Sequence, residues 1–432
     1  MTNKKSNILP IVVMYLLFFM IAFVTNLCNP MAVIVKNNFA MSNFAAQLGN
    51  AANFIAYAAM GIPAGMLLKK IGYRKTALVA ILIGFIGVFL QYMSGWAAIQ
   101  SFWVYLAGAF TAGFCRCMLN TVVNPMLNTL GGGGNKGNQL VQFGGVCNSL
   151  AAVLVTIIMG SLIADATKAQ IADATPALMI ALGVFAFAFL VLLLVKIPEP
   201  AQENEGDKAK DKKYSAFSFR HFNLGILAIF LYMGVEVGVP TYVMQYLTTS
   251  PDATTPGLGI NASIVGMIVA VYWLLMLVGR LLGGMIGGKV SSRAQITGVS
   301  ILCLVLVLLG MFLPTDVMVK MPGIDWATLT IMTAQVPVGV FALILVGLCT
   351  SVMWGGIFNM AVEGLGKYTS IASGAFMTMV CGGGILIPLQ GKLADVFGNF
   401  QMSYIVVLVC TAYILFYALV GSKNVNKDIP TE

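Results

Sequence analysis

The chain has 432 residues, of which 59% are apolar and only 9% are charged, and its mean hydropathy is +0.91. Soluble globular domains carry about a quarter charged residues, so this composition excludes an ordinary water-soluble domain and indicates a chain embedded in lipid. The net charge of +9 does not indicate a nucleic-acid partner, because the basic residues lie mostly between apolar runs, where they determine membrane orientation.

Apolar runs long enough to cross a bilayer recur along the whole chain. A helical span needs roughly 20 apolar residues, and these runs show no alternation of period two. Only helices and closed barrels satisfy their backbone hydrogen bonds in lipid, so we expect an all-α membrane protein with twelve transmembrane helices. Their predicted bounds are 9–34, 44–68, 76–95, 102–128, 139–164, 175–197, 223–247, 262–287, 294–313, 336–363, 370–391 and 402–421.

The basic residues are distributed unevenly between the two sides of this topology. With the N-terminus placed in the cytoplasm, the outward-facing segments hold only Lys36, Lys168, Lys320 and Lys392. The inward-facing segments are rich in lysine and arginine, as cytoplasmic loops are. The sequence therefore predicts that both termini and the central loop lie in the cytoplasm.

Polar side chains within the spans are costly in lipid and therefore mark candidate functional positions. In the fourth span, Arg116, Asn120, Asn124 and Asn128 stand four residues apart and share one helical face. We expect this face to line a watery cavity rather than a polar seam between helices. The other candidates of this half are Asn26 and Asn29 before Pro30, and Gln142 and Asn148 in the fifth span; hydrogen bonding within the helices is their alternative role.

The middle of the chain divides it into two related halves. Pro198-Glu199-Pro200 and a charged stretch follow the sixth span, as in a solvated linker. Gly65-Met66 with Lys70 and Arg74 recurs as Gly284-Met285 with Lys289 and Arg293. We therefore predict two pseudo-symmetric six-helix bundles, 1–197 and 223–432, joined by a cytoplasmic linker, 198–222, with a solute site between them.

The second half has its own polar and aromatic residues within the spans. Amides and aromatic rings suit a polyhydroxylated solute, although a tryptophan is equally typical of a helix core or of the membrane interface. Arg280 is expected to pair with Glu363 or to act at a gate rather than to bind solute. The remaining candidates are Tyr232 and Glu236 in the seventh span, Tyr272 and Trp273 in the eighth, Trp354 and Asn359 in the tenth, and Gln390 in the eleventh.

Carboxylates are scarce, which restricts the coupling chemistry. No Asp or Glu occurs before Asp165, so Glu236 is nearly the only deep carboxylate available to couple transport to a cation. Coupling to H⁺, coupling to Na⁺ and uncoupled facilitation all remain open. The eight cysteines lie in apolar runs and have no metal-ligand spacing, so we predict no metal and no cofactor.

Several motifs resemble the major facilitator superfamily and, within it, the fucose–galactose–glucose permease branch of bacteria. They are the loop from Gly65 to Lys75, Tyr272-Trp273 through Arg280, Trp354 through Glu363-Gly364-Leu365-Gly366-Lys367, and Gly382-Gly383 through Gln390 to Asp395. Asn124-Pro125 and Gln142 also match. The resemblance implies a cation–sugar symporter of the bacterial cytoplasmic membrane.

The sequence departs from this branch where coupling is expected. Asn120 stands where a glutamate is usual, a position near Pro30 lacks the aspartate of the proton symporters, Gly145 replaces an asparagine, and Lys69 replaces an acidic residue. Arg116 adds a buried positive charge, which suits an anionic sugar such as a sialic or uronic acid. Proton coupling by the usual route of the branch is thereby put in question.

These observations predict a monomeric, multi-pass transporter of a monosaccharide, working by alternating access. The alternatives are a carrier of anionic sugars and a non-transporting solute sensor. A membrane enzyme is excluded, because the chain has one histidine and no acid pair or metal cluster in its pattern. The predicted substrate-binding residues are Asn29, Arg116, Asn120, Asn124, Gln142, Asn148, Tyr272, Trp273, Trp354, Asn359 and Gln390, with Glu236 for coupling and Arg280 and Glu363 for gating.

Overall fold

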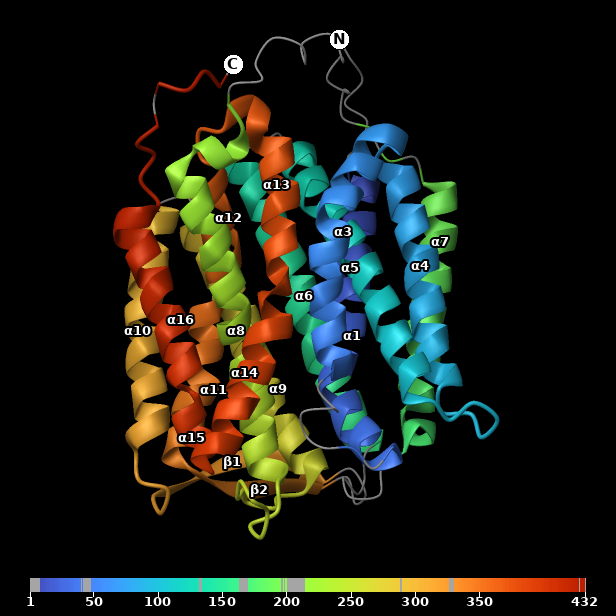
Figure 1. Ribbon diagram of the computed structural model, residues 1–432, viewed down its shortest axis with the longest axis vertical. Helices are drawn as coiled ribbons and strands as arrows, with labels where there is room; N and C mark the ends of the chain where they lie inside the picture. Colours follow the sequence, from blue (N-terminus) through green and yellow to red (C-terminus); the bar gives the residue numbers. More distant parts are fainter. Residues whose placement is uncertain are drawn as a thin grey trace.

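The computed structural model describes residues 8–39, 41, 48–131, 134–162, 170–195, 197, 199, 214–287, 290–325, 330–426 and 428–431. Long helices run side by side along the long axis of the molecule, and the C-terminal segment lies at the opposite end from a small β-hairpin (Figure 1). Among the described residues, twelve helical segments are long and apolar enough to cross a membrane, which confirms the predicted number of spans.

The first half of the chain forms its helices close to the predicted positions. Their inward-facing apolar side chains, among them Leu17, Ile81 and Phe185, form one buried cluster. The helices are α1 (Ile8–Asn38), α3 (Leu48–Ile71), α4 (Tyr73–Met93), α5 (Phe102–Leu130), α6 (Gly134–Leu162) and α7 (Thr175–Leu194), with a 3₁₀ turn η1 (Ile171–Ala174) before α7.

The second half differs from the prediction because three of its spans are broken. Its unbroken helices are α8 (Arg220–Thr248), α9 (Ala262–Ile286) and α10 (Ser292–Phe312), and η3 (Ala216–Ser218) precedes them. The tenth span consists of α11 (Val338–Thr350) and α12 (Met353–Val362) and is followed by η4 (Gly366–Tyr368). The eleventh span consists of α13 (Thr369–Thr378), η5 (Met379–Cys381) and α14 (Gly382–Phe397). The twelfth span consists of α15 (Phe400–Ser403), α16 (Ile405–Phe416) and the π-helical η6 (Tyr417–Gly421). The eleventh span extends six residues past its predicted end, to Phe397, and the next residue, Gly398, adopts a left-handed conformation (φ 59°).

A β-hairpin between α10 and α11 was not predicted. Strands β1 (Met318–Asp325) and β2 (Thr330–Pro337) pair antiparallel, with Met318 opposite Pro337. Met321, Ala334 and Val336 are buried, while their neighbours Pro322, Thr333 and Gln335 are exposed. This period-two pattern is typical of a sheet with one covered face. The pattern is short and adjoins apolar spans, so it could not be recognised in the sequence.

The glycines of the eleventh span combine close packing with a break in the helix. A Cβ at Gly383 would lie 2.9 Å from the Phe54 ring, and one at Gly384 would lie 2.8 Å from the Ala51 carbonyl oxygen. Side chains at these positions would therefore push α14 away from α3. Because the glycines directly follow the 3₁₀ turn η5, close helix packing and a break in the helix occur together in this span.

Among the described residues, the two halves contact each other mainly through three pairs of helices. Helix α3 packs against α13 and α14, and α6 packs against α9. The predicted linker lies mostly outside the described residues, at 198 and 200–213, and α8 begins at Arg220, three residues before the predicted boundary. The exact division into 1–197, 198–222 and 223–432 therefore stays a prediction.

Two charged side chains hold the start of α4 against the end of α7. Gly72, which precedes α4, has a φ of 81°, a conformation that favours glycine. The Glu199 carboxylate accepts hydrogen bonds from the backbone N–H groups of Tyr73 (2.7 Å) and Arg74 (3.1 Å). The Arg74 side chain in turn donates to the carbonyl oxygens of Leu192 and Leu193. Each side chain thus caps a helix end whose backbone groups lack helical partners.

Replacing Glu199 with Ala is expected to destabilise the first half. The substitution removes the acceptor for two helix N–H groups, and loss of a helix cap costs about 1 kcal/mol. The apparent melting temperature of the purified protein in detergent should fall by a few degrees. Asp316→Ala, which removes an exposed carboxylate before β1, is the control; equal melting temperatures for both variants would show that Glu199 is not a cap.

Candidate functional site

A polar cavity lies between the two halves of the chain. Its volume, counted as the space open to the centres of water molecules, is about 110 Å³, which is room for roughly seven to eleven waters on the same measure and comparable to a single monosaccharide. The first half contributes Phe18, Ile21, Thr25, Asn26, Asn50, Phe54, Tyr57, Arg116, Asn120, Asn124, Val141, Gln142, Gly145 and Asn148 to its wall. The second half contributes Met233, Glu236, Val237, Trp273, Arg280, Ser351, Trp354, Gly355 and Val380.

The polar face of α5 lies at this wall, as the spacing predicts. Arg116, Asn120 and Asn124 all line the cavity, and each is less than a tenth exposed. The Asn120 amide donates to the Tyr57 hydroxyl of α3 (2.9 Å), and the Asn124 amide donates to the Asn120 carbonyl oxygen (2.9 Å). These bonds use one donor of each amide and leave the rest of its hydrogen-bonding capacity for water or solute. The side chain of Asn128 lies outside the described residues.

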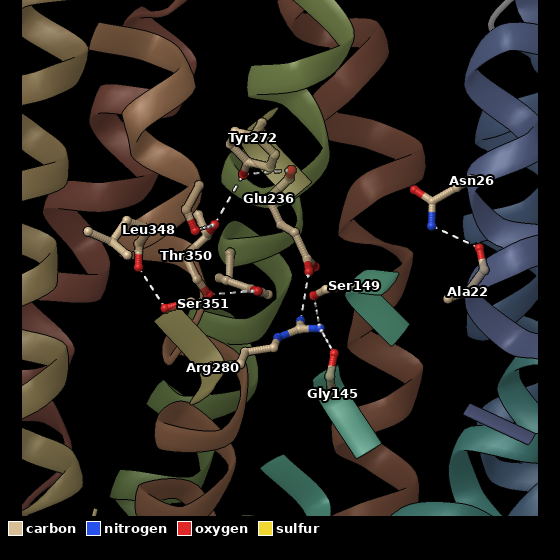
Figure 2. A network of polar contacts seen from close by, with 12 residues as sticks. Ala22, Asn26, Gly145, Ser149, Glu236, Tyr272, Arg280, Leu348, Thr350 and Ser351 are labelled. Atoms are coloured by element: carbon tan, nitrogen blue, oxygen red, sulfur yellow. Dashed lines mark hydrogen bonds and ion pairs between the residues drawn. The ribbon is translucent and has the colours of Figure 1, made fainter. Parts of the chain in front are cut away.

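Glu236 and Arg280 form an ion pair at the cavity wall. The Arg280 guanidinium lies 3.4 Å from the Glu236 carboxylate, and it donates to the Gly145 carbonyl oxygen (2.6 Å) and the Ser149 hydroxyl (2.9 Å) of α6. Figure 2 shows the guanidinium with Glu236 and Ser149 above it and Gly145 below it. Arg280 thus connects the two halves across the α6–α9 contact.

The expected pairing of Arg280 with Glu363 is wrong. Glu363 is exposed, and its backbone carbonyl oxygen lies 2.9 Å from His221 Nε2, while Arg280 pairs with Glu236. Glu236 and Arg280 are 44 residues apart on neighbouring helices, so helical periodicity gives no signal for their contact. A gating function of Glu363 remains a prediction.

A proline four residues after Glu236 explains why Tyr272 hydrogen-bonds to the backbone of Glu236. Pro240 lies within α8 and has no N–H, so the helical partner of the Glu236 carbonyl oxygen is missing. The Tyr272 hydroxyl donates to that oxygen (3.0 Å) and contacts the Thr350 hydroxyl (3.1 Å). Tyr272 is fully buried and does not line the cavity. It therefore stabilises the backbone at Glu236 and does not contact the solute.

Replacing Tyr272 with Phe is expected to leave the Glu236 carbonyl oxygen buried without a partner. A buried carbonyl group without a hydrogen-bond partner costs about 1–3 kcal/mol of stability. Both the apparent melting temperature and the rate of solute uptake should therefore fall. Tyr404→Phe is the matched control, because the Tyr404 hydroxyl also donates to a carbonyl of α8, that of Val239 (3.1 Å), which keeps its helical partner. Equal losses in the two variants would contradict this function of Tyr272.

Some of the other predicted residues line the cavity, and others lie outside it. Gln142, Asn148, Trp273 and Trp354 line the cavity. The others lie elsewhere: Asn359 lines a small polar pocket behind Gln142, Gln390 is buried with no partner for its amide, and the side chain of Asn29 lies outside the described residues.

Five polar residues of the cavity wall were absent from the predicted set: Thr25, Asn26, Asn50, Tyr57 and Ser351. Asn26 was considered only as a helix-kink residue or a solute contact, and its amide donates to the Ala22 carbonyl oxygen (2.8 Å). Asn50 and Tyr57 were missed, although their separation of seven residues, with Phe54 between them, places them on one face of α3. That spacing was the available signal. Within the described residues, no three His, Cys, Asp or Glu side chains come close enough to hold a metal ion.

Comparisons with known proteins agree with this architecture. The sequence profile of the Major Facilitator Superfamily matches residues 14–388. A glucose/galactose transporter of Brucella abortus is 28% identical over 98% of this chain and 96% of its own length. An L-fucose-proton symporter of Escherichia coli is 24% identical over 98% of this chain and 95% of its own length.

Solved structures show the same fold. A superfamily transporter, FucP, in its outward conformation has a TM-score of 0.73 at 21% identity and covers 97% of this chain and 100% of its own. The proton:xylose symporter XylE, bound to 6-bromo-6-deoxy-D-glucose, has a TM-score of 0.71 at 12% identity and covers 97% of this chain and 95% of its own. At these identities the likeness is one of fold.

Proposed function

Because this chain belongs to the Major Facilitator Superfamily, we propose that it is a secondary transporter that moves a monosaccharide across the bacterial cytoplasmic membrane by alternating access. The observation that carries the proposal is the cavity between the two halves, which has about the size of one sugar and is lined by amides and aromatic rings. Relatives over nearly the whole chain are named as sugar carriers, which supports the same class of substrate.

The wall of the cavity suits a sugar chemically. The ring of Trp273 or Trp354 offers an apolar face to the C–H side of a pyranose, and Asn120, Asn124 and Gln142 offer donors and acceptors to its hydroxyl groups. Alternating access requires the α6–α9 contact to open on one side and the α3–α13–α14 contact to change with it. The bonds of Arg280 to Gly145 and Ser149 lie in that contact and act as part of a gate.

Glu236 is the residue we assign to cation coupling. It is the carboxylate among the described residues that line the cavity, and its charge is balanced by Arg280. A proton or Na⁺ bound to Glu236 would weaken the ion pair between Glu236 and Arg280. Cation binding would thereby be coupled to the opening of the α6–α9 contact. Both termini are assigned to the cytoplasm from the distribution of basic residues, which reporter fusions at the C-terminus can test.

Uptake into proteoliposomes tests the function. Labelled D-glucose, D-galactose, L-fucose and D-xylose are supplied with and without Na⁺ and with and without an inward proton gradient. We expect saturable uptake of at least one sugar, stimulated by one of the two cations. Uptake that neither cation changes would remove the coupling role of Glu236, and the absence of uptake and binding for every sugar, neutral or acidic, would contradict monosaccharide transport.

A further inference from the structure

Arg116 places a positive charge at the cavity wall that no described carboxylate neutralises. Its side chain is 3% exposed and lines the cavity. No Asp or Glu precedes Asp165 in the sequence, and the carboxylate across the cavity, Glu236, is paired with Arg280. The charged side chains of the cavity wall are thus two arginines and one glutamate, with a net charge of +1.

The partners of Arg116 are neutral and incomplete. One terminal nitrogen donates to the Asn53 side-chain oxygen (3.1 Å), and the guanidinium carbon lies 5.0 Å from the centre of the Phe54 ring and 5.7 Å from that of Tyr57. The Nε–H group is buried without a hydrogen-bond partner. Neutral oxygens and rings are weak substitutes for an anion.

The guanidinium of Arg116 cannot become neutral by losing a proton. Arginine stays charged in proteins, and a buried charge without an opposite charge is strongly disfavoured. The position of Arg116 in a cavity of the size of a sugar, with a free donor, is therefore suited to a ligand that carries one negative charge.

On the basis of the proposed function, we infer that Arg116 binds the carboxylate of an acidic monosaccharide of the uronic-acid type. The carboxylate accepts hydrogen bonds from the guanidinium, including its unpartnered Nε–H, while Asn120 and Asn124, one and two turns along α5, face the ring hydroxyls. A single carboxylate neutralises the +1 charge of the cavity wall, whereas the double charge of a sugar phosphate would exceed it.

The experiment compares sugars that differ only at carbon 6. Binding of D-galactose, D-galacturonate and galactose 6-phosphate to the full-length protein in detergent is measured at neutral pH. We expect the wild type to bind D-galacturonate about 10- to 100-fold more tightly than D-galactose, as hydrogen bonds to charged groups are strong, and more tightly than the phosphate. Equal or weaker binding of the uronate, or a preference for the phosphate, overturns the inference.

Two variants locate the effect at Arg116. In Arg116→Gln the ratio of the D-galactose and D-galacturonate Kd values should fall to about 1, and in Arg116→Lys, which keeps the charge but loses the planar fork, it should be intermediate. A wild-type preference that Arg116→Gln retains would also contradict the inference. If D-galactose binds and the uronate does not, the inference fails while sugar transport stands; if no sugar binds, the proposed function fails.

Discussion

Replacing Glu236 with Gln is expected to lower uptake at least a hundredfold. Breaking a buried ion pair costs about 3–5 kcal/mol, which corresponds to a factor of about 10² to 10⁴. The variant leaves Arg280 with its neutral α6 partners, Gly145 and Ser149. Opening of the α6–α9 contact would then strip the guanidinium of all these partners, so the carrier should stay closed at this contact. Initial rates of sugar uptake, normalised to the amount of protein in the membrane, provide the measurement.

Two further variants separate the charge pair from general damage. Asp252→Asn removes an exposed carboxylate in the loop after α8 and should leave uptake within about twofold. Glu236→Gln combined with Arg280→Gln removes both charges; it should regain the melting temperature lost in the single variant but not the uptake. Wild-type uptake by Glu236→Gln would exclude the ion pair from the transport cycle.

Replacing Asn124 with Ala is expected to lower uptake ten- to hundredfold while the protein still inserts into the membrane. The Asn124 side chain lines the cavity, and its bond to Asn120 leaves an oxygen and one N–H for the sugar. Loss of one or two hydrogen bonds in a buried site, each of about 1–1.5 kcal/mol, corresponds to this decrease. Sugar affinity and uptake rate, measured on the same preparation, should fall together.

Thr111→Ala is the matched control for Asn124→Ala. Thr111 lies on the same helix, is exposed, and its hydroxyl donates to the carbonyl oxygen four residues earlier, that of Ala107 (2.8 Å). The two variants therefore lose the same kind of intrahelical bond, and only one of them loses a polar group at the cavity. Equal uptake by both variants would remove Asn124 from the proposed binding site.

The sequence predicted those parts of the structure that depend on a helical period. Twelve spans follow from the length of the apolar runs, and the placement of Arg116, Asn120 and Asn124 at one wall follows from their spacing on α5. The same rule applied to α3 would have predicted Asn50 and Tyr57 at the cavity.

Features that depend on contacts between helices could not be predicted in this way. The Glu236–Arg280 pair joins two helices, and the sequence instead led us to expect that Arg280 pairs with Glu363 or acts at a gate. The function of Tyr272 depends on the backbone group that Pro240 leaves free on another helix. The β-hairpin has an alternating pattern, but its apolar residues merge with those of the neighbouring spans. Tertiary packing determines all three.

Counterflow in proteoliposomes tests the central claim, that the cavity binds a sugar and carries it across the membrane. Vesicles preloaded with an unlabelled sugar that binds the protein are diluted into a trace of the same sugar in labelled form, without any ion gradient. A carrier should produce a transient accumulation of label inside, and Asn124→Ala should reduce it. Binding of the sugar without any exchange would contradict the account and indicate a solute sensor.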